Sequence, residues 1–253
     1  MPETPAGSGL VGDRPSERRH AARLGAVWSA LEPLVAPASA GGALDVLDIG
    51  GGTGGLAVRI AEAGHRVTVV DPSPDALAAL DRRARESGVT VAGEQGDLSS
   101  LPERGASVDL LLCHGVLELA DDPAAALAGL ASVLRPGGTL SLLVAQRHAA
   151  VIARAMAGHF QQARALLDED AAAPGSRGRR FVAEELLAWL QDAGLTPGLV
   201  QAIRVFADLV PGSLLDLEPG ATAALLELER AVAERPEFRP LAARLHVLAV
   251  RPA

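Results

Sequence analysis

The sequence predicts an α/β fold: a Rossmann-like, mostly parallel sheet of seven strands with helices on both faces and an antiparallel last strand. Short apolar segments alternate with helical segments through residues 44–145, the order that builds a parallel sheet covered on both sides. A glycine-rich loop joins the first strand to the first helix, as in folds whose ligands lie beyond the carboxyl ends of the strands. The 253 residues suffice for one large domain with a sizeable core.

The elements follow in a regular order. Residues 1–16 mix Pro, Gly, Ser and charge without periodicity, so we expect a flexible segment there and one domain over 17–253. Within residues 17–35 apolar side chains recur every three or four positions, which predicts a helix. Similar patterns predict strands at 44–49, 66–71, 89–94, 108–113 and 138–145, and helices at 54–64, 73–87 and 121–134.

The remaining segments predict a helical region and two closing strands. Residues 135–138 (Arg-Pro-Gly-Gly) are typical of a helix stop followed by a turn. We expect residues 149–195 to form a helical lid or substrate region, with helices at 149–168 and 182–193 around a loop at 171–180. Strands at 198–206 and 244–250 complete the sheet.

The glycine loop indicates a nucleotide cofactor. The run Val-Leu-Asp-Ile-Gly-Gly-Gly-Thr-Gly-Gly over 46–55 lets the backbone turn sharply and lets a ligand lie against bare main chain, while the next helix offers unpaired N–H groups. Asp71 ends the next strand, where a carboxylate can bind both hydroxyls of a ribose. Because Gly50, Gly52 and Gly55 also fit a dinucleotide loop, the loop alone leaves two cofactors open.

Composition excludes several chemistries. The chain has no Lys, Tyr or Asn, so all 23 basic residues are Arg. A Tyr/Lys hydride-transfer pair, a P-loop Lys and a Schiff-base Lys are therefore excluded, and a carboxylate or phosphate must be bound chiefly by Arg, His, hydroxyl or backbone groups.

The charge, cysteine content and hydropathy of the chain limit the partners, bound groups and cellular location that we expect. The net charge of −8 argues against a generally basic surface, and a solvated surface is the ordinary expectation for the short cluster Arg177, Arg179 and Arg180. With Cys113 alone, no intramolecular disulfide or cysteine-rich zinc site can form, and we expect no metal. No apolar run suggests a signal core or a membrane span, so we expect a cytoplasmic protein.

The polar residues at the strand ends, taken in order, favour one of the two cofactors. Asp48 precedes the glycines, Asp71 ends the second strand, Gly96 and Asp97 follow the third, His114 follows the fourth, and a Leu-Arg-Pro-Gly-Gly turn leads into the fifth. This set resembles the class I S-adenosylmethionine-dependent methyltransferases. The resemblance implies that S-adenosylmethionine is bound by Asp48 (orienting the loop), Gly50, Gly51, Gly52 and Gly54 (beneath the methionine part), Asp71 (ribose), Gly96 and Asp97 (adenine), and His114 (methyl-transfer edge).

The chain also resembles one narrower family, and this resemblance extends over most of its length. Arg23 with Trp28, His-Gly-Val-Leu-Glu at 114–118, Met-Ala-Gly-His-Phe at 156–160, and Ile-Arg-Val-Phe-Ala-Asp at 203–208 are similar to the bacterial methyltransferases that esterify carboxymethoxyuridine at the tRNA wobble position. It implies O-methyl transfer to a carboxylate, with tRNA as a partner, and it places Arg23 on the methionine carboxylate of the cofactor. The lysine-rich loop of that family is replaced here by 171–180, with only three Arg.

Arg204 is the candidate contact for the substrate carboxylate, because a planar guanidinium matches two carboxylate oxygens. A surface ion pair is the alternative for this residue. For the whole chain, two alternatives stay open: a methyltransferase acting on a small-molecule metabolite, and a cofactor-binding module without catalysis.

Overall fold

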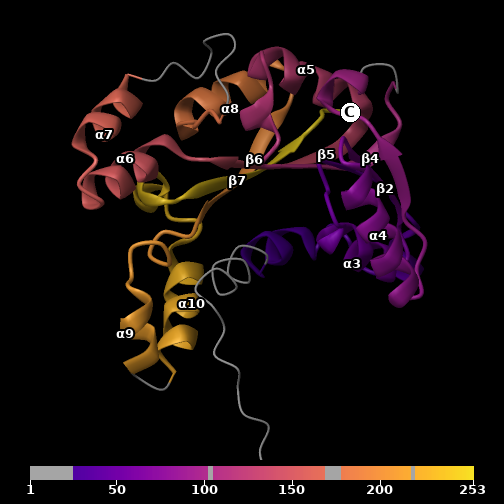
Figure 1. Cartoon of the computed structure of the whole chain (residues 1–253). Helices are drawn as coiled ribbons and strands as arrows, with labels where there is room; N and C mark the ends of the chain where they lie inside the picture. Colours follow the sequence, from indigo (N-terminus) through magenta and orange to yellow (C-terminus); the bar gives the residue numbers. More distant parts are fainter. Residues whose placement is uncertain (1–24, 102–104, 169–177, 218–219) are drawn as a thin grey trace, which may run out of the picture.

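The computed structural model describes residues 25–101, 105–168, 178–217 and 220–253. A seven-stranded sheet runs through it in the order β3-β2-β1-β4-β5-β7-β6 (Figure 1). All neighbours are parallel except that β7 runs antiparallel to both β5 and β6, which confirms the predicted fold class. The strands are β1 (Asp45–Ile49), β2 (Arg66–Asp71), β3 (Ala92–Gln95), β4 (Val108–His114), β5 (Leu134–Ala145), β6 (Thr196–Ile203) and β7 (Arg244–Val250).

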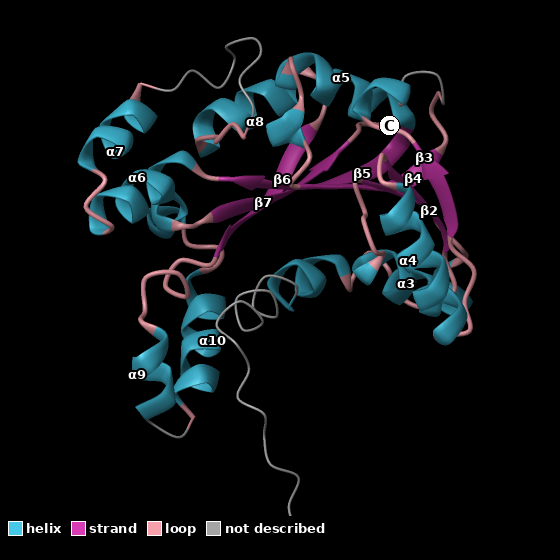
Figure 2. Cartoon of the chain, viewed as in Figure 1, coloured by secondary structure: helices cyan, strands magenta, loops and turns pink. Residues whose placement is uncertain are grey.

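Helices cover both faces of the sheet (Figure 2). One face carries α5 (Pro123–Val133) and α8 (Ala183–Asp192), which bury Leu127, Leu130, Leu186 and Leu190 in one core cluster. The other carries α3 (Gly55–Glu62), α4 (Pro74–Glu86) and the helix at 25–31, whose buried side chains join a second cluster. Because the central strands are buried on both faces, they consist of nearly continuous apolar runs.

The expected helix at 149–168 is wrong, because the structure has two. Helix α6 (Arg147–Met156) and helix α7 (Phe160–Leu167) are separated at Gly158, whose φ of 77° is left-handed. A glycine in that conformation commonly ends a helix. The third strand is also shorter than expected, since the Val89 N–H donates to the Ala84 carbonyl and extends the end of α4 instead.

The expected turn at 135–138 lies inside β5 rather than before it. The pairing shifts register between Val108 with Leu134 and Leu110 with Thr139, so the extra residues form an irregularity in the strand. Gly137, with φ 80°, sits in this irregularity and its N–H donates to the Arg251 carbonyl.

Residues 204–243, between β6 and β7, form helices that the sequence analysis did not assign. They are α9 (Gly212–Leu217), α10 (Ala221–Val232) and the short 3-10 helix η4 (Pro236–Leu241). Figure 1 shows α9 and α10 projecting away from the sheet. The remaining short helices are α2 (Ala38–Gly41), η1 (Leu98–Ser100) and η3 (Leu117–Leu119). Within the described ranges, no helix combines the length and hydropathy needed to cross a membrane.

Candidate functional site

A cavity of about 970 Å³ opens at the carboxyl ends of β1, β2 and β4. Parallel strands end at one edge of their sheet, so the loops that follow them converge there. Five of the predicted cofactor residues line this cavity: Gly50, Asp71, Gly96, Asp97 and His114. Arg23 lies outside the described residues.

Asp71 connects two walls of this cavity. Its Oδ2 accepts the Gly52 N–H at 2.9 Å, and its Oδ1 accepts the Ser73 N–H at 2.9 Å. Asp71 does not itself cap α4, because Ser73 Oγ accepts the Ala76 N–H and fills that role. Each carboxylate oxygen has a second lone pair, so the side chain retains acceptor sites for ribose hydroxyls.

The glycine loop is held close to its neighbours at Gly51 and Gly54. A Cβ on Gly51 would lie 2.5 Å from Asp48 Oδ2. A Cβ on Gly54 would lie 2.1 Å from Leu80 Cδ1 of α4, and φ there is 74°. In contrast, a Cβ on Gly52 would meet no heavy atom within 4 Å. The loop therefore packs tightly on the protein side and leaves open space at Gly52.

Asp48 lies beneath the loop and is not among the residues that line the cavity. Its side chain is buried, and this burial, followed by the negative charge of Asp71, raises its pKa to about 7. A carboxyl group with that pKa is partly protonated at neutral pH.

Asp97 is held at the cavity rim by Ser99. The carboxylate Oδ1 accepts the Ser99 side-chain hydroxyl at 2.6 Å and the Ser99 N–H at 2.8 Å. These two hydrogen bonds hold the pKa of Asp97 below its usual value. Gly96 fits closely here, since a Cβ would lie 2.9 Å from Ser100 Oγ.

His114, which is partly exposed, begins a row of polar side chains that continues into the sheet and that the sequence analysis missed. Its Nε2 lies 2.9 Å from Ser141 Oγ, which lies 2.8 Å from His246 Nε2. His246 Nδ1 in turn lies 3.1 Å from Gln201 Oε1. The available signal was that Ser141, His246 and Gln201 each stand between two apolar residues of their strands.

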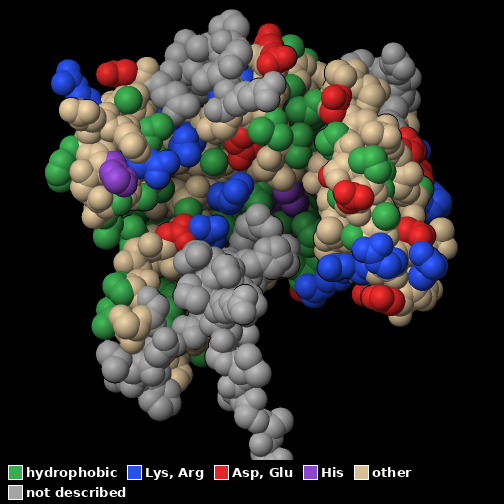
Figure 3. All heavy atoms as spheres, viewed as in Figure 1, with side chains coloured by type: hydrophobic (Ala, Val, Ile, Leu, Met, Phe, Trp, Pro, Cys, Tyr) green, Lys and Arg blue, Asp and Glu red, His purple; other side chains and the backbone are tan. Residues whose placement is uncertain are grey.

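A second cavity, of about 420 Å³, opens beside the ends of β5 and β6. Arg154, Arg180, Arg204 and Asp208 are among its lining residues. Figure 3 shows basic side chains gathered over this part of the molecule. This arginine cavity lies at the same edge of the sheet as the cavity at His114, because β4, β5 and β6 are parallel.

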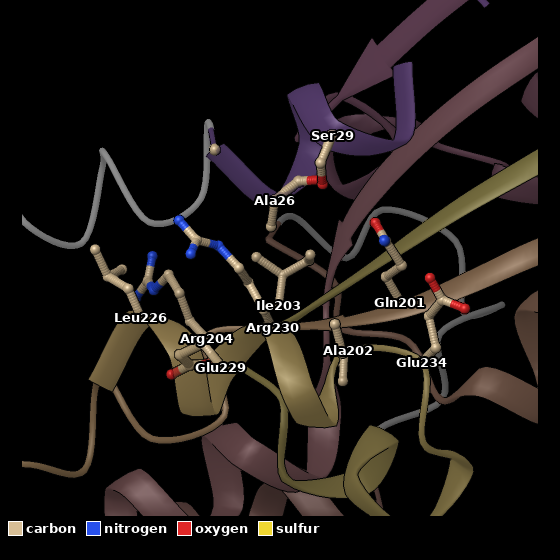
Figure 4. A pocket seen from close by; sticks show the side chains of 12 residues that line it. Ala26, Ser29, Gln201, Ala202, Ile203, Arg204, Leu226, Glu229, Arg230 and Glu234 are labelled. Carbon is tan, nitrogen blue, oxygen red and sulfur yellow. The ribbon is translucent and has the colours of Figure 1, made fainter. Parts of the chain in front are cut away.

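Arg204 follows β6 directly and has an unusual backbone. Its φ of 60° is the one positive value found at a non-glycine residue within the described ranges. Its Nη2 donates to Asp208, so the ion-pair alternative holds in the structure, whereas a substrate contact stays a prediction. Figure 4 shows Arg204 and Arg230 pointing toward the same side of a smaller cavity between β6, α10 and the helix at 25–31.

Glu229 of α10 fixes the turn that carries Arg204. Its buried carboxylate accepts three consecutive backbone N–H groups, those of Val205 at 2.9 Å, Phe206 at 2.8 Å and Ala207 at 2.7 Å. The sequence analysis missed this role because the partners are 22 to 24 residues away along the chain.

Arg179 contradicts the expected solvated basic cluster, because it is fully buried. Its guanidinium donates to the carbonyls of Ala120 and Asp121, the second at 2.9 Å, and both of these residues line the first cavity. Arg180 instead lines the arginine cavity, and Arg177 lies outside the described residues. At least one of the three arginines thus supports the cavity wall rather than the surface.

A doubly wound sheet with a glycine loop after the first strand and a carboxylate at the end of the second is typical of Rossmann-like proteins that bind a nucleotide cofactor. Comparison with known proteins shows which family within this class the chain belongs to. Residues 46–138 match the family model described as "Methyltransferase domain". The tRNA 5-carboxymethoxyuridine methyltransferase of Escherichia coli K12 is 32% identical over 214 residues, covering 83% of this chain and 80% of that protein.

Two further relatives share the fold or sequence. The ubiquinone biosynthesis O-methyltransferase of Xanthomonas axonopodis pv. citri is 34% identical over 192 residues, covering 72% of this chain and 73% of that protein. The crystal structure of magnesium protoporphyrin IX methyltransferase from Synechocystis PCC 6803 with bound SAH superposes on this structure with a TM-score of 0.63. The two sequences are 20% identical, and the superposition covers 97% of this chain and 90% of that chain. The chain therefore belongs to the class I S-adenosylmethionine-dependent methyltransferases, and its cofactor is S-adenosylmethionine.

Proposed function

We propose that this methyltransferase esterifies the carboxylate of carboxymethoxyuridine at the tRNA wobble position. The observation that carries the proposal is the arginine cavity, where Arg154, Arg180 and Arg204 lie at the same sheet edge as the cavity at His114. Three guanidinium groups favour an anionic acceptor. The E. coli relative also supports it, since the similarity extends over 83% of the chain and is not confined to the cofactor-binding part.

In this proposal the first cavity holds the cofactor. Gly50, Gly51, Gly52 and Gly54 lie beneath its methionine part, Asp71 binds the ribose hydroxyls, Gly96 and Asp97 meet the adenine, His114 lines the methyl-transfer edge, Asp48 orients the loop, and Arg23 binds the methionine carboxylate. The remaining acceptor sites of Asp71 and the open space at Gly52 fit this arrangement.

The proposed chemistry needs alignment more than proton transfer. S-adenosylmethionine supplies an electrophilic methyl group on a sulfonium sulfur. A carboxylate acceptor is already ionised at neutral pH, so the protein need not provide a general base. Alignment and exclusion of water can then account for about 7 kcal/mol or more of the barrier.

Arg204 is proposed to orient the acceptor carboxylate. Asp208 pairs with its guanidinium, and Glu229 holds the backbone of residues 205–207 that follow it, so the position of Arg204 is constrained before the substrate arrives. Residues 149–195 are proposed as the lid or substrate region; within this range α7 and most of α6 are the candidates for a lid, whereas α8 packs on the sheet.

Deletion of the coding sequence tests the proposal in the cell. Nucleosides from tRNA of the deletion strain should lack the wobble methyl ester, and the unmodified carboxymethoxyuridine should accumulate. Complementation with the natural protein and with Arg82→Met, a change on an exposed face of α4, should restore the ester, whereas Arg204→Met should restore little. Unchanged methyl ester in the deletion strain would overturn the tRNA assignment.

A small carboxylated metabolite is the second candidate acceptor. The net charge of −8 and the burial of Arg179 reduce the basic surface available to RNA phosphates, and the Xanthomonas relative is named for ubiquinone biosynthesis. Methyl transfer to a metabolite pool but not to tRNA would favour this candidate. Cofactor binding without transfer to either pool would favour the non-catalytic alternative.

A further inference from the structure

Four polar side chains, of which His114 is partly exposed and the other three are buried, form a continuous row across the sheet. His114, Ser141, His246 and Gln201 belong to β4, β5, β7 and β6, which are adjacent in that order. The successive contacts measure 2.9 Å, 2.8 Å and 3.1 Å. Only His114 lines the cofactor cavity, whereas Gln201 lines the smaller cavity shown in Figure 4. The row therefore connects two cavities on separate parts of the sheet.

The chemistry of the last member sets the direction of these hydrogen bonds. Gln201 Oε1 is an acceptor only, so His246 Nδ1 must carry the proton that it receives. His246 is neutral, since burial lowers its pKa to about 4, and its Nε2 is then an acceptor. Ser141 must donate its hydroxyl proton to His246, which leaves Ser141 Oγ to accept the Nε2–H of His114.

We infer that Ser141, His246 and Gln201 are positioning residues that fix the tautomer of His114 at the methyl-transfer edge. When the His114 ring carries a single proton, this row holds that proton on Nε2, and Nδ1 is then the acceptor nitrogen of the ring. This inference does not depend on which acceptor is methylated. It also assigns Gln201, three strands away from His114, a role at the cofactor site.

The direction of the hydrogen bonds in this row matters because two of its members have no contact with water. Ser141 and His246 are fully buried, and a buried polar group without a partner costs about 1–3 kcal/mol. Each member therefore has to match the hydrogen that its neighbour offers. If Gln201 stops accepting, His246 can move its proton to Nε2, Ser141 can rotate, and His114 then has to protonate Nδ1 instead.

Nitrogen-15 NMR of histidine-labelled protein tests this directly, because bare and protonated ring nitrogens have distinct shifts. The chain has six histidines, and His114→Gln and His246→Gln assign the two signals. The natural protein should show His246 protonated at Nδ1, the less populated tautomer of a free imidazole, and His114 protonated at Nε2. A bare Nδ1 on His246 would overturn the inference without any variant.

Two substitutions of Gln201 test whether a change at this end of the row alters the tautomer of His114 at the other end. Gln201→Glu keeps an acceptor, so both tautomers should stay as in the natural protein. Gln201→Met removes it with similar volume, so His246 should change to Nε2–H and His114 to Nδ1–H. In a Ser141→Ala background, Gln201→Met should leave the His114 signal unchanged, because the connection is already broken.

Activity gives a second readout. We expect kcat/KM for S-adenosylmethionine to fall about threefold to tenfold in Gln201→Met, the effect of one ordinary hydrogen bond. Circular dichroism and the Arg82→Met control separate this change from misfolding. If His114 keeps its tautomer in folded Gln201→Met, the inference is wrong, even when the activity falls.

Discussion

The Asp71 carboxylate accepts the Gly52 N–H at 2.9 Å, and this hydrogen bond joins the end of β2 to the glycine loop that follows β1. A second bond, to the Ser73 N–H, joins the same carboxylate to the start of α4. One side chain thus fixes the geometry of the loop and, in our proposal, binds the cofactor ribose.

Asp71→Ala should weaken S-adenosylmethionine binding at least tenfold, because it removes the ribose contact and leaves two N–H groups unpaired. Isothermal titration calorimetry measures this loss. Asp75→Asn, an exposed change in the first turn of α4, serves as the control and should bind normally. Equal affinity of Asp71→Ala and the natural protein would remove Asp71 from the cofactor site.

Gly51→Ala should destabilise the fold by about 1–3 kcal/mol, since its Cβ would lie 2.5 Å from Asp48 Oδ2 and 3.0 Å from Val69 Cγ1. Gly55→Ala is the matched control. It starts α3, and the nearest heavy atom to its Cβ is 3.7 Å away, so we expect a neutral or stabilising effect. Urea unfolding compares the two, and equal loss in both variants would contradict the packing described at Gly51.

Asp48→Asn should change how stability depends on pH. The raised pKa of Asp48 means that the folded state favours the protonated form, so its contribution is present below about pH 4 and is lost as pH rises toward about 7. His246 acts oppositely: its lowered pKa of about 4 makes stability fall as pH drops below about 6.5. In the natural protein these two contributions offset each other.

The Asn variant removes only the Asp48 contribution. Its free energy of unfolding should therefore fall from pH 7 to pH 4 more steeply than that of the natural protein, by about 1–3 kcal/mol over the window. Urea titrations at several pH values measure the two curves. Parallel curves would show that Asp48 is ionised normally in the folded protein.

Substitutions of the neighbouring residues Arg179 and Arg180 should have different effects. The first should lower the stability of the protein, and the second should weaken its interaction with the methyl acceptor. Arg179→Met leaves the carbonyls of Ala120 and Asp121 without their donors and should lower stability by about 1–3 kcal/mol. Arg180→Met should leave stability nearly unchanged and raise KM for the methyl acceptor. Thermal unfolding and steady-state kinetics report the two effects, and a reversal of the pattern would contradict the assignment of the arginine cavity.

The sequence predicted the strand order of the parallel half and the strand ends that meet at the first cavity, because these signals are local. The glycine loop, Asp71 and His114 stand at the ends of strands whose order follows from the alternation of strand and helix. By contrast, Glu229 acts on a turn more than 20 residues away, and the burial of Arg179 depends on a tertiary contact with the 118–121 segment. Such contacts leave no periodic pattern. Gly158 did mark the break between α6 and α7, but a single glycine also occurs within helices.

The most direct measurement is mass spectrometry of tRNA nucleosides after incubation of purified protein with S-adenosylmethionine carrying a deuterated methyl group. The tRNA should come from cells that retain carboxymethoxyuridine but lack its methyl ester. We expect the labelled methyl group on carboxymethoxyuridine, with a much lower yield from Arg204→Met and an undiminished yield from Arg82→Met. Label absent from tRNA, while calorimetry shows that the same preparation binds S-adenosylmethionine, would contradict the proposed acceptor.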